Sequence, residues 1–416
     1  MSPFQVFAVV LSLSAAFAYV NQRSVRLPPG IGIMAMSLVV STVMILVDKA
    51  GVVALRPALV DFVARAELGH TLLHGMLGAL LFAGALHVDL GELRRERATV
   101  LGLSFVGTLL STALVGLAFF AVSSVVASPV SLGYAFLFGA LVSPTDPVAV
   151  LGILKAAKVP KRLETQIAGE SLLNDGVGVV VFGALVGIVV EGRAAHASDV
   201  AIAFVREAIG GAVFGAVGGY VTYRLLRSID HYQTELLLTL ALVFGGYALA
   251  ERLHVSAPLA AVVSGLIIGN AGREHGMSDV TRDHLDKFWA LVDDVLNAVL
   301  FVLVGLELTA LPLAASTLGL GALAVVVVLL SRFVSVAVPL TAMRRVVRPV
   351  KGTIPVLTWG GVRGGISIAL ALSLPPSDTR DVILTVTYVV VVFSVLVQGL
   401  TLGGVAKRFV REAEPG

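Results

Sequence analysis

Long apolar segments follow one another along the whole chain, and this pattern is compatible with few kinds of fold. Most contain close to, or more than, the 20 apolar residues that a helix needs to cross a bilayer core about 30 Å thick. Their expected bounds are 4–20, 30–47, 70–88, 98–127, 131–154, 164–190, 199–226, 233–251, 255–269, 286–308, 315–342, 353–374 and 381–406. They predict an all-α polytopic membrane protein with about 13 transmembrane helices, forming a single unit over residues 1–416.

The amino-acid composition favours a membrane location and excludes several classes of site. Hydrophobic residues make up 57% of the chain and charged residues only 14%, whereas soluble domains carry about 25% charged residues. Cysteine is absent, so disulfides, cysteine-ligated zinc and iron–sulfur clusters are excluded. Lys and Arg stand in short connections rather than along one face, which argues against nucleic-acid binding. We expect no cofactor, and no metal other than a transported ion. The first segment lacks a preceding basic residue and is interpreted as a retained span rather than a signal peptide.

The basic residues alternate between the two sides of the predicted membrane. Of the 30 Lys and Arg, 21 lie in or beside the connections after odd-numbered segments, with Arg224 and Lys287 at segment ends and the C-terminal tail included, and six lie in those after even-numbered segments. Because basic connections stay in the cytoplasm, the N-terminus is expected outside and the C-terminus inside. The expected location is a bacterial inner membrane, with lipid as a partner.

An internal similarity pairs the two halves of the chain. The stretch 80–90 resembles 299–308, and the proline-entered stretch 27–40 resembles 255–269, both at an offset near 220 residues. This offset pairs segments 1 to 6 with segments 8 to 13 and leaves the seventh as a connector, which inverts the second copy in the membrane. Two inverted six-helix repeats are typical of secondary transporters, whose site lies near the midplane at discontinuous helices in matching positions.

Two segments in matching positions carry helix-breaking residues. In 139–152, Pro144 and Pro147 flank Thr145 and Asp146, and each proline removes a backbone donor and disturbs the preceding turn. Backbone freed at this depth must line protein or a water-filled cavity. The freed carbonyls, with Thr145 and Asp146, supply the oxygen ligands that a dehydrated alkali cation requires. The alternative is a proline kink in which Asp146 caps the following helix.

The matching segment, 358–372, contains four glycines around Arg363. An arginine inside a bilayer costs at least about 2.5 kcal/mol, so it needs a partner. Glu170, the glutamate of the sixth segment, is the candidate, and a Glu170–Arg363 ion pair would be structural. A second pair, between Arg332 and Glu307 on neighbouring helices, is also expected.

The stretch GESLLNDGVG (169–178) brings further polar residues into the sixth segment. Residues four apart share a helix face, so Ser171 accompanies Asp175 and Glu170 accompanies Asn174. If Glu170 is occupied by Arg363, Asp175 is left without a positive partner, and burial then favours its neutralisation by a proton or a cation. Competition for one carboxylate is the minimal chemistry of antiport, because an empty charged site is too costly to move. The alternative is a structural hydrogen bond within the helix bundle.

Four motifs in order resemble those of one transporter family. The motifs are SPTDPVAV, GESLLNDGVGVVVF, FWALVDDVLNAVLFVLVGLEL and WGGVRGGISIALAL. Nearly along the whole chain they resemble the first subfamily of the monovalent cation/proton antiporters, the bacterial NhaP-type sodium/proton exchangers.

The resemblance implies a homodimer of 13-helix subunits with crossed discontinuous helices. It implies a transport core (98–190 and 315–406) that moves in an elevator-like way against an interface part (1–90 and 199–308). It implies that Asp175 carries Na⁺ or Li⁺ and the proton in alternation, with Asp146 and Thr145 at the crossing, and that Glu170 pairs with Arg363. The neighbours Asn174 and Asp175 imply electroneutral one-for-one exchange.

The sequence departs from the family at one position and leaves some assignments open. Relatives often carry a glutamate where this chain has Ala83, so ion selectivity stays open and K⁺/H⁺ exchange is the alternative. His87 and Asp89 are expected to belong to the connection after the third segment. Three residues, Asp293, Asp294 and Asn297, are candidates for an ion entrance. An aspartyl protease is disfavoured because no GxGD motif is present, and a channel needs no proton-titrating carboxylate.

Overall fold

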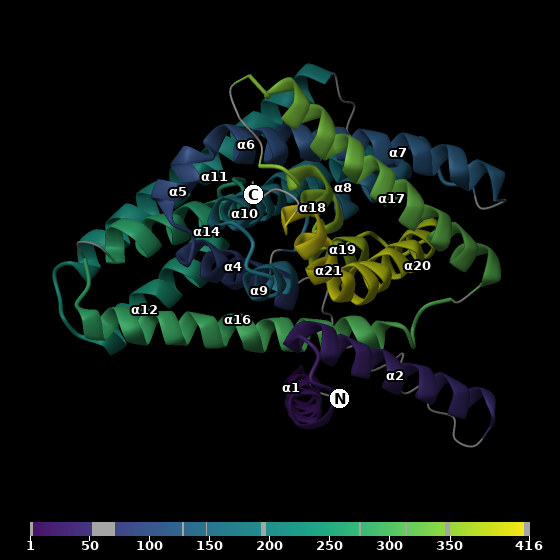
Figure 1. Ribbon diagram of the computed structural model, residues 1–416, viewed down its shortest axis with the longest axis horizontal. Coiled ribbons are helices and arrows are strands. Elements are labelled where there is room, and N and C mark those ends of the chain that lie inside the picture. The colour runs from purple at the N-terminus through teal and green to yellow at the C-terminus, as the bar shows by residue number, and fades with distance from the viewer. Residues whose placement is uncertain are drawn as a thin grey trace.

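The computed structural model describes residues 3–51, 71–126, 129–146, 148–192, 197–273, 276–312, 314–345 and 350–411. The described residues form helices and connecting turns, with no strand among them (Figure 1). The predicted Pro147 lies outside the described residues.

Eight helical stretches of the described chain are long and apolar enough to cross a membrane. Some of these stretches contain a π turn (η) within the helix. For example, α20 and α21 are joined by a π turn and together form a single spanning stretch. The helices are α1 (Pro3–Val20) with η1 (Asn21–Val25); α2 (Pro29–Lys49); α6 (Arg97–Leu101), η2 (Gly102–Gly107) and α7 (Thr108–Val125); α10 (Lys161–Val189); α12 (Tyr232–Leu240), η3 (Ala241–Gly245) and α13 (Gly246–Arg252); α16 (Asp279–Glu307); α17 (Ala315–Ala342); and α20 (Asp378–Phe393), η5 (Ser394–Gln398) and α21 (Gly399–Arg411).

The other predicted segments also correspond to helices. Three are single stretches: α4 (Thr71–Leu86), α11 (Ala197–Leu226), and α14 (Ala257–Ile267) with η4 (Ile268–Gly272). Two are interrupted: α8 (Leu132–Val142) with α9 (Val148–Ala156), and α18 (Thr353–Trp359) with α19 (Gly365–Leu372). A short helix, α5 (Leu90–Arg95), connects α4 to α6. The thirteen predicted helical segments are therefore confirmed.

The outer face of the bundle is apolar. On α11, Ile209, Val213 and Val217 follow one another at a spacing of four residues and are 59%, 57% and 59% exposed. Residues at this spacing share one face of a helix, and an extended apolar face marks contact with a membrane or another protein. The exposed face of α11 therefore suits a lipid environment.

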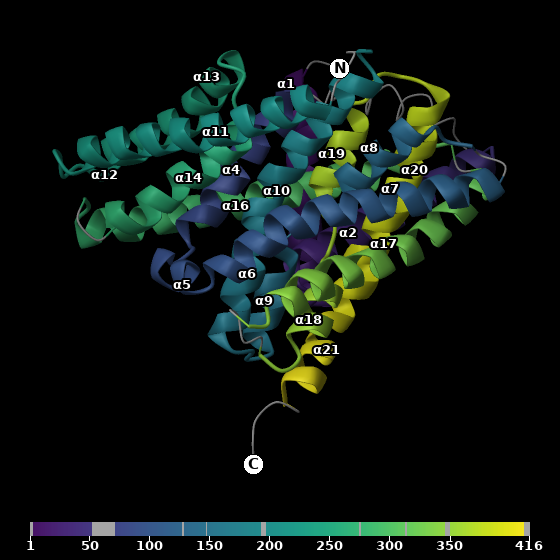
Figure 2. The same ribbon diagram turned by 90° about the horizontal axis from the view of Figure 1, so that it is seen from above.

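The helices pack in two groups around the central helix α10. The contacts α7–α8, α7–α17, α17–α20 and α19–α20 join one group, and α4–α14, α11–α14, α2–α16 and α4–α16 join the other. Figures 1 and 2 place α7, α17 and α20 on one side of the molecule and α11, α12 and α14 on the other. Because α10 contacts α8 and also α14 and α11, its polar residues lie between the groups.

The order of elements around the interruptions occurs twice. An interrupted helix followed by a long helix is seen in α8, α9 and α10, and again in α18, α19 and α20. This recurrence agrees with the predicted repeat and places both breaks at matching points of the two halves.

Candidate ion-binding site

The two interrupted helices meet at their breaks. The backbone amide of Asp146, in the break between α8 and α9, donates to the carbonyl oxygen of Val362 (2.8 Å), in the break between α18 and α19. The Val362 amide in turn donates to the carbonyl oxygen of Gly360 (2.8 Å). The bond between the two breaks thus satisfies a backbone amide of one break and a backbone carbonyl of the other. Non-helical backbone within a membrane protein requires such partners.

A hydrogen-bonded network ties the first break to α10. The Thr145 amide donates to Oδ1 of Asn174 (3.2 Å), and Nδ2 of Asn174 donates to Oγ1 of Thr145 (2.9 Å). The hydroxyls of Thr145 and Ser171 lie 2.9 Å apart. All three residues are buried. The structure therefore brings together Thr145, Ser171 and Asn174, as the sequence predicts, and presents hydroxyl and amide oxygens at one point.

Asp175 lies next to this network in α10 and is 3% exposed. Its Oδ1 atom has no hydrogen-bond partner among the described residues. The expectation that Asp175 has no positive neighbour is wrong, because Arg363 is not taken by Glu170 and its guanidinium interacts favourably with the Asp175 carboxylate, while Asp146 repels it. A buried carboxylate oxygen without a partner costs free energy unless a proton or cation satisfies it. This geometry favours the ion-binding interpretation over a structural hydrogen bond.

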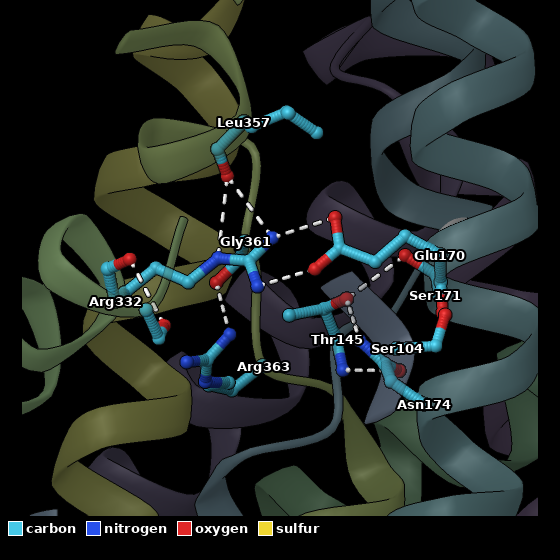
Figure 3. Close-up of polar contacts among 10 residues, drawn as sticks. Ser104, Thr145, Glu170, Ser171, Asn174, Arg332, Leu357, Gly361 and Arg363 are labelled. Atoms are coloured by element: carbon cyan, nitrogen blue, oxygen red, sulfur yellow. Dashed lines mark hydrogen bonds and ion pairs between the residues drawn. The ribbon is translucent and has the colours of Figure 1, made fainter. Parts of the chain in front are cut away.

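The expected Glu170–Arg363 ion pair is wrong. Glu170 is bound instead by Arg332 of α17, whose Nη1 and Nη2 donate to Oε1 (2.5 Å) and Oε2 (3.0 Å) of the carboxylate. Figure 3 shows this two-pronged contact, with Arg363 below it. Arg332 also donates to the Leu357 carbonyl oxygen in α18 through Nε (3.3 Å) and Nη2 (3.2 Å). The expected Arg332–Glu307 pair is wrong for the same reason. Arg332 joins α10, α17 and α18, and its geometry is the planar bidentate one for which arginine is suited.

Arg363 forms a different set of contacts, which are with the backbone of the second break and with η5. Its Nη1 donates to the Gly361 carbonyl oxygen (2.8 Å), and its backbone amide donates to Oγ of Ser394 (2.8 Å). The Ser394 hydroxyl donates to Oε1 of Gln398 (2.6 Å), whose Nε2 donates to the Trp359 carbonyl oxygen (2.9 Å). Ser394 and Gln398 are the two ends of the π turn η5, a feature frequent at functional sites.

Gly364 allows Asp146 to approach the second break. A Cβ built at Gly364 would overlap the Asp146 carboxylate and would lie 2.8 Å from its Cβ. The backbone of Gly364 has φ of −108°, so the requirement for glycine is one of space rather than of conformation.

We expect Gly364→Ala to abolish cation/proton exchange and to destabilise the protein by about 1–3 kcal/mol, because the added methyl displaces Asp146. The control is Gly183→Ala in α10, where no atom lies within 4 Å of the added Cβ. Exchange in liposomes and thermal unfolding of both variants check the prediction. Exchange at the rate of the Gly183→Ala control would show that the position of Asp146 is unimportant.

The candidate entrance residues lie on α16. The Asn297 side-chain amide donates to Oδ1 of Asp293 (3.1 Å), and Asp293 interacts electrostatically with Asp146. Asp294 and Asn297 line a cavity of about 790 Å³ between α1, α2, α9 and α16. The cavity therefore lies beside a polar residue pair that is coupled electrostatically to the site.

The residues of the third segment lie where the sequence predicts. Ala83 is buried in an apolar cluster with Phe82 and Leu172. His87 bonds the Ala83 carbonyl oxygen through Nδ1 (2.9 Å) at the end of α4. Asp89 caps α5, because the amides of Glu92 (3.1 Å) and Gly91 (2.7 Å) donate to its carboxylate. These hydrogen bonds lower the pKa of Asp89, and the bond from Glu92 has the larger effect.

Three residues of the site are not identified by the sequence. Ser394 gives no signal, because serine is tolerated in membrane helices, and Gln398 shows only that an amide in an apolar segment needs a hydrogen-bond partner, without naming that partner. Arg332 does give a signal, because an arginine within an apolar segment needs an acidic partner. The sequence does not say which acid that partner is.

Two interrupted helices that cross beside buried ionisable side chains define a secondary transporter. The chain belongs to the family described as sodium/hydrogen exchanger, transmembrane, whose model matches residues 10–408. It is thus an integral membrane protein and a transporter rather than an enzyme, and the predicted cation/proton antiporter family is confirmed.

Relatives of known name support the assignment. The chain is 49% identical over 409 residues to the Na⁺/H⁺ antiporter NhaP of Pseudomonas aeruginosa, covering 96% of each chain. It is 37% identical over 349 residues to the Na⁺/H⁺ antiporter NhaH of Halobacillus aidingensis, covering 81% of this chain and 83% of the relative. Its fold matches the sodium proton antiporter MjNhaP1 of Methanocaldococcus jannaschii with a TM-score of 0.77 at 19% identity, covering 98% of both chains.

Proposed function

We propose that the protein exchanges Na⁺ or Li⁺ for H⁺ across the membrane, one for one, with both ions competing for Asp175. The observation that carries the proposal is the partnerless Oδ1 atom of buried Asp175, among the described residues, beside the Thr145, Ser171 and Asn174 network. The names of the relatives, Na⁺/H⁺ antiporters, support the choice of ions.

The stoichiometry follows from the charge of the site. A proton covalently neutralises Asp175, and a monovalent cation neutralises it electrostatically with help from nearby oxygens. A negative, empty site carries the cost of a buried carboxylate whose Oδ1 atom has no hydrogen-bond partner among the described residues. Only the two neutral states then cross the membrane easily, so each cation moved one way is matched by one proton moved the other way.

The motion we propose is an elevator-like displacement of a core (98–190 and 315–406) against an interface part (1–90 and 199–308) within a homodimer. The two packing groups around α10 support this division, because the breaks and Arg332 lie in the first group. Asp293, Asp294 and Asn297 would form the ion entrance from the cytoplasm. The alternation of basic connections supports an outside N-terminus and a cytoplasmic C-terminus in a bacterial inner membrane.

Purified protein in liposomes with a trapped pH dye tests this function. Sodium, lithium or potassium is added in turn, with and without a clamped membrane potential. We expect Na⁺ and Li⁺ to move protons at a rate that ignores the potential, because the neutral loaded site carries no net charge across the membrane.

Other outcomes contradict separate parts of the proposal. A rate that depends strongly on the potential would contradict one-for-one exchange. A response to K⁺ alone would favour the K⁺/H⁺ alternative, which uses the same oxygen ligands in a larger cavity. No proton movement with any of the three ions would contradict cation/proton exchange itself.

A further inference from the structure

One face of α16 carries polar residues at both ends and apolar residues between them. Asp293, Asn297, Leu300, Val304 and Glu307 follow one another at spacings of four and three residues, which places them on a single face. At the polar end, Asn297 lines the cavity of about 790 Å³ and is hydrogen-bonded to Asp293. The face therefore runs from a large cavity, past the crossing, to a second acid.

The second acid, Glu307, is enclosed. It is 6% exposed and lines a cavity of about 20 Å³ together with Val304 of α16 and Leu372 of α19. That volume suffices for about one water molecule. Burial and the field of Arg380, rather than a hydrogen bond, are the influences on the Glu307 carboxylate among the described residues.

The groups that face Glu307 come from α20. Its carboxylate interacts electrostatically with Arg380, near the start of α20, although the ion pair that Arg380 forms is with Asp381 (Nη1 to Oδ1, 3.7 Å). Tyr388 of α20 also interacts electrostatically with Glu307, and its buried hydroxyl has no hydrogen-bond partner among the described residues. Arg380 donates to the Leu372 carbonyl oxygen (3.3 Å) at the end of α19. The cationic group thus belongs to the elements that carry the second break, whereas the acid belongs to α16.

An apolar contact separates the two polar ends of the face. A Cβ built at Gly365, the first residue of α19, would lie 2.5 Å from Cγ of Leu300. Leu303 and Ile368 line the small cavity beyond this contact. Such close packing excludes water, so Glu307 is shut off from the crossing while α19 lies against α16.

We propose that Glu307 is the cation-attracting carboxylate of a second access path, which opens between α16 and α19 when the first cavity closes. The proposal rests on the proposed exchange, since a second path is needed only if the site faces both sides in turn. While the path is closed, the field of Arg380, which is shared with Asp381, balances only part of the charge of the acid. When α19 and α20 move away, Glu307 loses Arg380 and attracts a monovalent cation from water.

Transport measured from each face tests this role. We expect Glu307→Gln to raise the half-saturating Na⁺ concentration about tenfold when Na⁺ is added to right-side-out vesicles, which corresponds to about 1.4 kcal/mol. Added to everted vesicles, Na⁺ should give a value within about twofold of the wild type. Glu307→Asp should restore most of the affinity, and Asp378→Asn, at an exposed acid near Arg380, should change nothing. Equal changes at both faces, or none, would overturn the proposal.

Labelling supplies a readout that does not depend on transport. Because the chain has no cysteine, Glu307→Cys provides one labelling site for a membrane-impermeant maleimide, and Ala315→Cys, at an exposed position, is the control. We expect the control to react constantly from outside, and Glu307→Cys to react from outside at a rate that changes when an Na⁺ gradient shifts the conformation. A Glu307→Cys variant that never reacts, while the Ala315→Cys control does, would overturn the second path. If the wild type exchanged no cation, the proposed function would fail, while reaction of Glu307→Cys from outside without any gradient would still report whether the path opens.

Discussion

Asp175→Asn is expected to reduce cation-driven proton movement in liposomes to background, a loss of at least about 100-fold, as when a proton-transferring group is removed. An amide neither releases a proton at neutral pH nor carries the charge that attracts a cation. The change is nearly isosteric in α10, so the surrounding network of Thr145, Ser171 and Asn174 has no steric reason to move.

The folded state should not suffer from this substitution. The Asp175 carboxylate is 3% exposed and has an oxygen without a hydrogen-bond partner among the described residues, so its charge opposes folding. We expect the melting temperature of Asp175→Asn to equal or exceed that of the wild type. Asp89→Asn, at the cap of α5, is the control and should transport normally. Exchange by Asp175→Asn at the wild-type rate would remove Asp175 from the mechanism.

Arg332→Ala is expected to destabilise the protein by about 3–5 kcal/mol, because it leaves the Glu170 carboxylate buried without its cation. Both side chains are nearly inaccessible, at 6% and 1% exposed, and Arg332 also satisfies the Leu357 carbonyl oxygen. Thermal unfolding in detergent measures the effect. Arg95→Ala removes the partner of Glu92 in an exposed pair and should cost at most about 1 kcal/mol.

A double-mutant cycle distinguishes the two arginines as partners of Glu170. We expect Glu170→Gln to be strongly coupled to Arg332→Ala, because neither charge is left alone once both are gone. Coupling of Glu170→Gln to Arg363→Ala should be weaker, since Arg363 donates to the Gly361 carbonyl oxygen instead. The reverse order of coupling energies would restore the Glu170–Arg363 pair that the sequence suggested.

The helices and both breaks could be predicted from the sequence because their causes are local. Twenty or so apolar residues are enough to define a membrane helix, whatever surrounds it. Pro144 in one segment and the glycines around Arg363 in another interrupt the helix by their own backbone properties. The spacing of four residues between Ser171 and Asp175 likewise follows from helix geometry alone.

The partner of Glu170 could be decided only by the tertiary structure. The sequence shows that each arginine inside the membrane needs an acid, but two arginines and several acids satisfy that rule equally. Which pair forms depends on how α10, α17 and α18 are rotated and spaced, and these quantities follow from packing between distant segments. Arg332 projects from α17 to Glu170, whereas Arg363 turns to its own broken backbone. The sequence by itself thus determined where the helices end and which polar residues lie within them, because these properties are local. Long-range packing decided which of those polar residues meet.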